Sequence, residues 1–220
     1  MIVDIKKLTK TFSDGSTKLH VLKDINLQID KGSIITIKGP SGSGKSTLLS
    51  IIGTLDNADS GELLISGISI QENTNIDKLR NKSIGFVFQF HNLISELTLE
   101  ENVSLPKMIA KEQLDKKELI ELFEYFDLKD RMNSFPNDLS GGEKQRVAVM
   151  RAIINNPSII IADEPTGNLD KENALKMMSL FQKLNTEKKL TIIVATHDEH
   201  VFNIGHKKYQ LVDGSLELVH

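Results

Sequence analysis

The chain has 220 residues, of which 39% are hydrophobic, and this allows one large or two small domains with a substantial core. It has no cysteine, which excludes disulfides, zinc knuckles and thiol catalysis, and its net charge of −3 gives no general attraction for nucleic acid. No long apolar run and no signal-peptide pattern is present, so we expect a cytoplasmic chain that reaches a membrane only through a partner.

The first 38 residues are predicted to be rich in strands. Apolar residues alternate over 2–5, recur over 22–29 and form a run over 33–38. Phe12 precedes a polar loop, where its flat ring could stack on a nucleobase. On spacing alone, a core position for Phe12 is the favoured alternative.

Residues 39–46 fit the pattern G-x-x-x-x-G-K-[ST], between an apolar run and a helical apolar pattern. This is the pattern of a P-loop, in which backbone N–H groups converge on phosphate oxygens. Lys45 is expected to reach the β- and γ-phosphates, and the Ser46 hydroxyl to ligate Mg²⁺. The predicted phosphate-binding residues are Gly39, Pro40, Ser41, Gly42, Ser43, Gly44, Lys45, Ser46 and Thr47. The dinucleotide-binding pattern is almost met as well, but Thr47 stands where it has Gly or Ala, which disfavours a Rossmann site.

The middle of the chain changes from a strand pattern to a helical one. Residues 60–67 and 83–88 are predicted strands, and the pattern from about residue 98 to 154 is mostly helical. Thr98 and Glu101 have the spacing of a helix capping box. An apolar stripe at helical spacing, most simply part of the core, comprises Leu114, Leu119, Leu122, Phe123 and Phe126. We interpret this region as an inserted helical subdomain.

The segment 139–143 is the second unusual stretch. Ser140 and Glu143 again have capping-box spacing, ahead of a helical pattern. Gly141 and Gly142 in a first helical turn cost up to about 1 kcal/mol each relative to Ala, which suggests that something approaches this backbone closely. A helix N-terminus with Ser and Gly is an anion site, although the P-loop already supplies one. A loop that is merely flexible is the alternative.

Two acids follow the buried strand predicted at 159–162. Ligands of parallel sheets bind beyond the carboxyl ends of the strands, so Asp163 and Glu164 should face the phosphates. Asp163 could hold Mg²⁺ directly or through water, and Glu164 could orient the attacking water or accept its proton. His197 follows the strand predicted at 190–195, where a γ-phosphate contact is favoured over a structural histidine. Surface carboxylates are the alternative for the two acids.

In this order, the P-loop, Gln89, the 139–143 segment, the Asp163-Glu164 pair and His197 resemble the ATP-binding subunits of ABC transporters over essentially the whole chain. The resemblance implies an α/β fold of the P-loop NTPase (ABC ATPase) type, with a RecA-like core, an antiparallel β subdomain and an inserted helical subdomain. Residues 1–220 would be a single ABC ATP-binding domain. Its nucleotide-binding core would span about 1–90 and 155–220, and its helical subdomain, with the signature, about 91–154.

The resemblance also implies a homodimer that holds two ATP molecules between the P-loop of one copy and the signature of the other. The signature residues acting in trans would be Ser140, Gly141, Gly142 and Glu143. Phe12 matches the aromatic residue, usually Tyr, that stacks on adenine, and Asp170 matches a loop that crosses the dimer interface. Gln89 matches the loop that touches Mg²⁺ or water and senses the membrane subunit. The implied catalytic residues are Lys45, Gln89, Glu164 and His197, and the implied Mg²⁺ site comprises Ser46, Gln89 and Asp163.

Two segments indicate which branch of the family this chain resembles. Residues 161–170 are similar to the exporter-like branch, which holds lipoprotein-releasing, macrolide or peptide exporting and cell-division ATPases, and residues 88–93 are most similar to the lipoprotein-releasing (Lol-type) ATPases. We therefore expect ATP hydrolysis that drives lipoprotein release at the cytoplasmic face of the inner membrane. Integral membrane permease subunits would dock near Gln89 to Leu99.

Three alternatives remain. A macrolide or peptide exporter ATPase and a cell-division-type regulatory ATPase share the motifs. A DNA-repair or chromosome-organising ATPase shares them too, but the interval between P-loop and signature is too short for a coiled coil and cysteine is absent. No nucleic-acid partner is expected.

Overall fold

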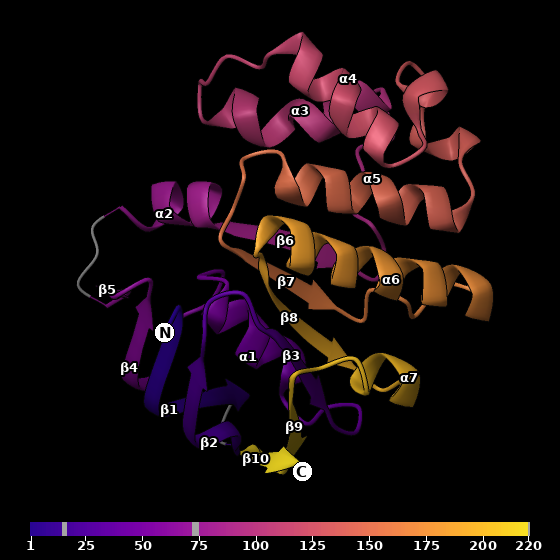
Figure 1. The fold of residues 1–220 in the computed structure, drawn as a ribbon. Coiled ribbons are helices and arrows are strands. Elements are labelled where there is room, and N and C mark those ends of the chain that lie inside the picture. Colours follow the sequence, from indigo (N-terminus) through magenta and orange to yellow (C-terminus); the bar gives the residue numbers. More distant parts are fainter. Residues whose placement is uncertain (15–16, 72–74, 220) are drawn as a thin grey trace.

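The strands of the protein form two sheets in the computed structural model, which describes residues 1–14, 17–71 and 75–219 (Figure 1). An antiparallel sheet has the order β2-β1-β4-β5. Its strands are β1 (Val3–Asp14), β2 (Thr17–Ile29), β4 (Ser60–Ile65) and β5 (Ile68–Ser69). The larger sheet has the order β10-β9-β3-β8-β7-β6, parallel except for the edge strand β10. Its strands are β3 (Ile34–Lys38), β6 (Ile84–Phe88), β7 (Ile159–Asp163), β8 (Thr191–Thr196), β9 (Lys207–Val212) and β10 (Ser215–Val219). This is the predicted ABC ATPase arrangement of a parallel core with an antiparallel β subdomain.

The helices cover both faces of the larger sheet. They are α1 (Lys45–Ile52), α2 (Ile76–Ser83), α3 (Leu99–Ile109), α4 (Lys116–Tyr125), α5 (Gly141–Ile153), α6 (Lys171–Lys188) and α7 (Glu199–Phe202). Helix α1 packs between the two sheets, whereas α5 and α6 lie on the opposite face with α3 and α4 beyond α5 (Figure 1). Within the described residues, no helix combines the length and apolar character needed to cross a bilayer.

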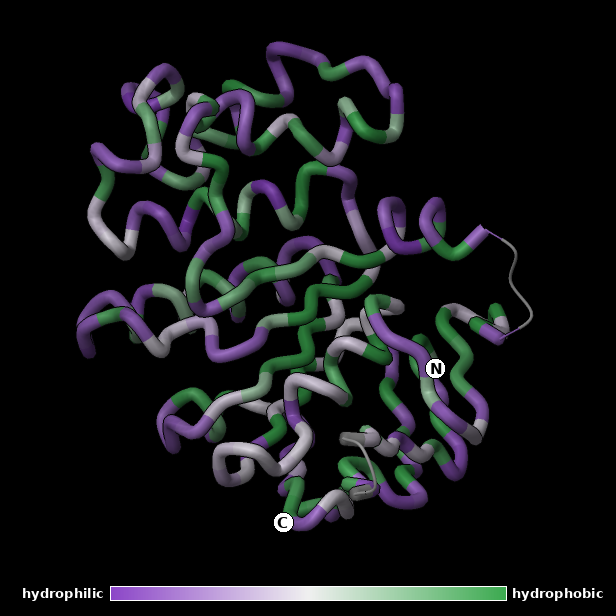
Figure 2. The backbone as a smooth tube through the Cα atoms, turned by 180° about the vertical axis from the view of Figure 1, so that it is seen from behind, coloured by the Kyte–Doolittle hydropathy of each residue, from purple (hydrophilic) through white to green (hydrophobic). Residues whose placement is uncertain are grey.

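The central strands are buried on both faces, which explains their continuous apolar sequences. In β7, Ile159 and Ile161 pack into the cluster that contains α1, whereas Ile160 and Ala162 pack into the cluster that contains α5 and α6. This division follows the two-residue period of a strand, and runs of this kind are typical of parallel sheets covered by helices. The hydrophobic stretch is visible through the middle of the molecule in Figure 2. The sheet therefore forms a rigid support for the loops at its carboxyl edge.

Helical structure between residues 98 and 154 begins at the predicted capping box. The Thr98 hydroxyl accepts a hydrogen bond from the backbone of Glu101, whose carboxylate accepts one from the Thr98 backbone at 2.7 Å. The apolar stripe of α4 is part of the core, with Leu119 and Phe123 fully buried. Both predictions are confirmed.

Thr98→Ala should lower the free energy of unfolding by about 1 kcal/mol, because the first turn of α3 loses its side-chain cap. Chemical denaturation of the purified chain measures the loss. Ser95→Ala is the matched control: Ser95 is exposed, its side chain makes no hydrogen bond within the described residues, and its replacement should change stability by less than about 0.5 kcal/mol. Equal stability of the two variants would contradict the role of the cap.

Candidate functional site

The P-loop connects β3 to α1 and requires glycine at two places. A Cβ atom at Gly39 would lie 2.2 Å from the carbonyl oxygen of Leu211, so only glycine fits beside β9. Gly44 has φ +102°, a conformation that L side chains rarely adopt, and it directly precedes the first residue of α1. The loop backbone is therefore set at the N-terminus of a buried helix, where free N–H groups favour an anion.

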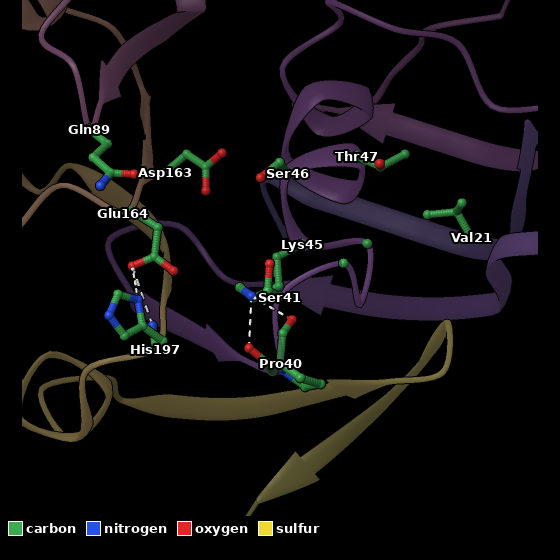
Figure 3. Close-up of a pocket in the computed structure, with 13 residues that line it drawn as sticks. Val21, Pro40, Ser41, Lys45, Ser46, Thr47, Gln89, Asp163, Glu164 and His197 are labelled. Atoms are coloured by element: carbon green, nitrogen blue, oxygen red, sulfur yellow. Dashed lines mark hydrogen bonds and ion pairs between the residues drawn. The ribbon is translucent and has the colours of Figure 1, made fainter. Parts of the chain in front are cut away.

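Lys45 is the first residue of α1, and its side chain reaches back to the loop. The residue is 8% exposed, and its Nζ donates hydrogen bonds to the carbonyl oxygens of Gly39 at 2.8 Å and Pro40 at 3.1 Å (Figure 3). No carboxylate of the described residues lies within ion-pair distance of this ammonium group. A buried cation held only by carbonyl dipoles is well prepared to receive a phosphate.

Most of the predicted site residues line one cavity of about 730 Å³ (Figure 3). Its walls comprise Val21, Gly39, Pro40, Ser41, Gly42, Gly44, Lys45, Ser46, Thr47, Gln89, Asp163, Glu164 and His197. Of the predicted P-loop residues, Ser43 is buried behind the wall. Residues separated by more than 150 positions thus meet because the parallel strands all end at this edge.

The side chains of Asp163 and Ser46 point toward each other in the cavity (Figure 3). One carboxylate oxygen of Asp163, Oδ1, is buried without a hydrogen-bond partner among the described residues. Burial raises the pKa of Asp163, the nearby Ser46 hydroxyl lowers it, the charge of Glu164 raises it and the charge of Lys45 lowers it. An unpartnered carboxylate oxygen beside a hydroxyl fits the all-oxygen ligand set that Mg²⁺ takes together with phosphate oxygens.

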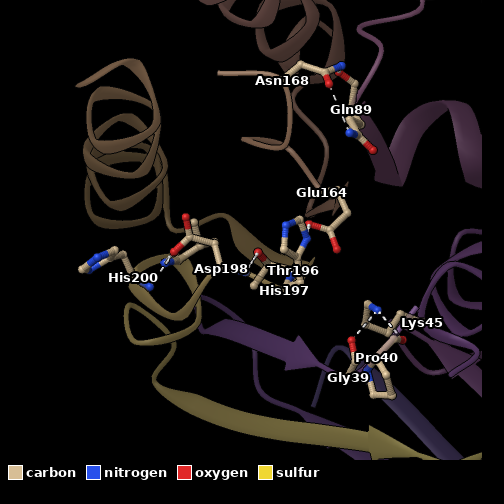
Figure 4. Close-up of polar contacts among 11 residues, drawn as sticks. Gly39, Pro40, Lys45, Gln89, Glu164, Asn168, Thr196, His197, Asp198 and His200 are labelled. Atoms are coloured by element: carbon tan, nitrogen blue, oxygen red, sulfur yellow. Dashed lines mark hydrogen bonds and ion pairs between the residues drawn. The ribbon is translucent and has the colours of Figure 1, made fainter. Parts of the chain in front are cut away.

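Glu164 begins the turn after β7 in a left-handed conformation, with φ +48°. Its backbone N–H donates to the Ala195 carbonyl at 3.0 Å, which fixes the turn to β8. The carboxylate oxygen Oε2 lies 2.9 Å from Nδ1 of His197 and accepts a hydrogen bond from the His197 backbone at 3.3 Å (Figure 4). The Glu164 side chain is 18% exposed and that of His197 72%, so the carboxylate is sheltered at the cavity wall and the imidazole is open to solvent.

Gln89 is paired with Asn168, a contact that the sequence did not reveal. The Gln89 side-chain amide donates to Asn168 Oδ1 at 3.2 Å, and the Asn168 amide donates to the Gln89 carbonyl at 3.1 Å (Figure 4). A Cβ atom at Gly167 would lie 2.7 Å from the Gln89 amide nitrogen, so glycine allows this close approach. The loop after β6 is therefore linked to the loop after Glu164.

Phe12 is 45% exposed, so the alternative of a core position is wrong. The Lys10 ammonium lies 5.1 Å from the centre of its ring. Phe12 does not line the cavity, whereas Val21, on the strand paired with β1, does. Sequence analysis missed Val21, because an apolar residue in a strand carries no signal of ligand contact.

The signature segment lies at the start of α5, outside this cavity. The Ser140 hydroxyl and the Glu143 carboxylate form the predicted capping box, and these hydrogen bonds lower the pKa of Glu143. A Cβ atom at Gly142 would lie 2.8 Å from Asn173 Oδ1, so close packing on α6 accounts for this glycine within the chain. Gly141 is exposed, with room for a side chain, and Asp170 caps α6 through the Asn173 backbone at 2.9 Å.

Comparisons with known proteins agree with this geometry. A family model described as ABC transporter matches residues 22–167. The lipoprotein-releasing system ATP-binding protein LolD of Treponema denticola is 44% identical to this chain, over 99% of this chain and 98% of that protein. The LolD protein of Bacteroides thetaiotaomicron is also 44% identical, over 98% of this chain and 99% of that protein. A dimeric post-hydrolysis structure of the ATP-binding cassette MJ0796 of Methanocaldococcus jannaschii, bound to ADP and Pi, superposes with a TM-score of 0.89 at 41% identity, over 99% of each chain.

Proposed function

The chain belongs to the ABC transporter family and is an ATPase, and from this premise we propose that it powers a membrane transporter that releases lipoproteins from the inner membrane. The observation that carries the proposal is the likeness, over nearly the whole chain, to proteins named LolD. The segment 88–93 supports it, because it resembles the same group of ATPases. Residues 1–220 act as one ATP-binding domain, with a core at about 1–90 and 155–220 and a helical subdomain at about 91–154.

In the proposed reaction, the P-loop amides and Lys45 bind the phosphates of ATP. The Lys45 ammonium exchanges its two loop carbonyls for β- and γ-phosphate oxygens. Ser46 and Asp163 would hold Mg²⁺, with Gln89 at the same wall of the cavity. When bound, Mg²⁺ supplies positive charge that offsets the charge of the phosphates during the transfer.

Glu164 and His197 serve the hydrolytic step. Glu164 orients a water molecule and takes its proton as the water oxygen bonds to the γ-phosphorus and the bond to the bridging oxygen of ADP breaks. His197 turns from Glu164 toward the γ-phosphate, and its exposure leaves it room to do so. The rigid turn at Glu164 holds the carboxylate in place for attack.

The complete site is proposed to need a second copy of the chain. The first turn of α5 lies outside the cavity of its own chain, and its exposed Gly141 leaves the helix N-terminus accessible to the γ-phosphate bound by a partner. Ser140, Gly142 and Glu143 shape this turn, and Asp170 would lie at the contact between copies. Phe12 would stack on adenine beside Val21. The MJ0796 structure, which is dimeric and bound to ADP and Pi, supports the dimer.

The proposed location is peripheral, at the cytoplasmic face of the inner membrane, with permease subunits docked near Gln89 to Leu99. Phe90 and Ile94 in this segment are 74% and 43% exposed, which suits them to contact a partner. Movement of the docked subunit would act on Gln89 at the cavity wall.

Reconstitution of the chain with its membrane subunits tests this function. Proteoliposomes that carry a triacylated lipoprotein should release it on addition of ATP, and the same polypeptide without acyl chains should not respond. Glu164→Gln serves as the inactive control. ATP hydrolysis without lipoprotein release, but with transport of a macrolide or peptide, would favour the exporter alternative. Stimulated hydrolysis without any transport would favour the regulatory alternative.

A further inference from the structure

The loop after β6, residues 89–92, has a constrained backbone that has no role in the proposed reaction. His91 and Asn92 both have positive φ, +63° and +50°. Consecutive left-handed residues that are not glycine are disfavoured, because Cβ approaches a carbonyl oxygen. Such a conformation persists only where the surrounding structure fixes it.

Arg151, on the last turns of α5, supplies the fixing contacts. Its two terminal nitrogens donate to the carbonyl oxygens of Asn92 at 2.6 Å and His91 at 2.7 Å. Both bonds are short, and the guanidinium fork matches two neighbouring acceptors at once. Burial lowers the pKa of Arg151, and no carboxylate of the described residues lies within ion-pair distance. The two carbonyls therefore take the place of a counter-charge.

A second contact ties the start of the same loop to the same helix. Gln145 on α5 is fully buried, and its amide lies 3.4 Å from the Phe88 carbonyl, which directly precedes the loop. The ring of His91 is packed inward, with Nε2 buried and unpartnered among the described residues. Both ends of the loop are thus held by the helix that Ser140 caps.

We propose that Arg151 is a positioning residue for ATP hydrolysis, which holds the backbone of His91 and Asn92 so that Gln89 stays at the cavity wall. When a docked membrane subunit displaces the loop, the same contacts move α5. The signature at the start of α5, roughly 16 Å along the helix from Arg151, moves with it. This second part rests on the proposed docking near Gln89 to Leu99. The first part concerns the isolated subunit.

Arg151→Met tests the proposal, because methionine keeps much of the volume and removes both donors. Arg80→Met is the matched control, since Arg80 also donates to a backbone carbonyl, that of Thr54 at 2.9 Å, but away from the loop. The chain has no tryptophan, so Phe90→Trp provides a single fluorescent reporter on the exposed side of the loop. The variants of the isolated subunit are compared in this Phe90→Trp background, and the reconstitution experiments keep Phe90, because it lies in the proposed docking segment.

We expect Arg151→Met to lower kcat about 10-fold with KM for ATP within about twofold, because the P-loop is untouched. Tryptophan anisotropy should fall, since the loop is released. Arg80→Met should change neither value, and Arg151→Lys, which can donate to one carbonyl, should recover part of kcat. If Arg151→Met does not fold, Arg151→Lys carries the comparison with Arg80→Lys. The proposal is overturned if kcat and anisotropy equal those of the Arg80 variant.

Reconstitution separates this inference from the proposed function. If the parent chain releases no lipoprotein, the proposed function fails, and the isolated-subunit measurements still decide the role of Arg151. If the membrane subunits raise the ATP hydrolysis rate of the parent chain, they should raise the rate of Arg151→Met far less, although this variant still binds them. An unchanged ratio would overturn the coupling through α5.

Discussion

Glu164→Gln should reduce ATP turnover by about 10²-fold or more while ATP binding is retained. Glutamine has the shape of glutamate and can keep the left-handed turn and its hydrogen bond to the Ala195 carbonyl. It cannot accept the proton of the attacking water, because its amide is not basic. Single-turnover hydrolysis measures the chemical step, and size-exclusion chromatography with ATP should show a trapped dimer.

Glu172→Gln is the matched control for this variant. Glu172 is an exposed carboxylate on α6 that pairs with Lys176 at 2.6 Å, so its loss should leave turnover unchanged. Hydrolysis by Glu164→Gln at the parental rate would remove Glu164 from its assigned role. A dimer that forms without nucleotide would instead argue against ATP-dependent association of the two copies.

Lys45→Ala should weaken ATP binding by roughly 10- to 100-fold, because two charge-assisted contacts to phosphate are lost. Isothermal titration calorimetry measures the affinity. Since Lys45 is buried, Lys45→Met is needed as well: it fills most of the space and should bind as weakly as the alanine variant. Lys176→Ala, at an exposed lysine, is the control. Parental affinity of the Met variant would contradict the P-loop contact.

The parts of the site that could be predicted are those that a short segment determines by itself. The P-loop spacing, the capping boxes at Thr98 and Ser140 and the acids after β7 each follow from local residue order. The continuous apolar run of β7 also identified a strand buried on both faces. For this reason the sequence alone predicts the cavity and most of its wall.

The contacts that could not be predicted join distant segments. Asn168 meets Gln89 across 79 positions, and Arg151 meets His91 across 60, through bonds to backbone carbonyls that accept from any donor. Neither pair has a spacing rule. Helix α2 was missed for another reason: none of its residues is buried, so it has no apolar stripe to show its period. Strand β5, with two residues, is too short to show a pattern.

Helix α1 carries the phosphate site at its N-terminus and lies between the two sheets, so it packs against both of them. Leu48 and Ile52 of this helix are fully buried in the same cluster as residues of β1, β2 and β3. Bound ATP stabilises the folded state by mass action, and here the gain extends to the antiparallel layer as well as to the parallel core. We therefore expect saturating ATP to protect the antiparallel layer against unfolding along with the parallel core.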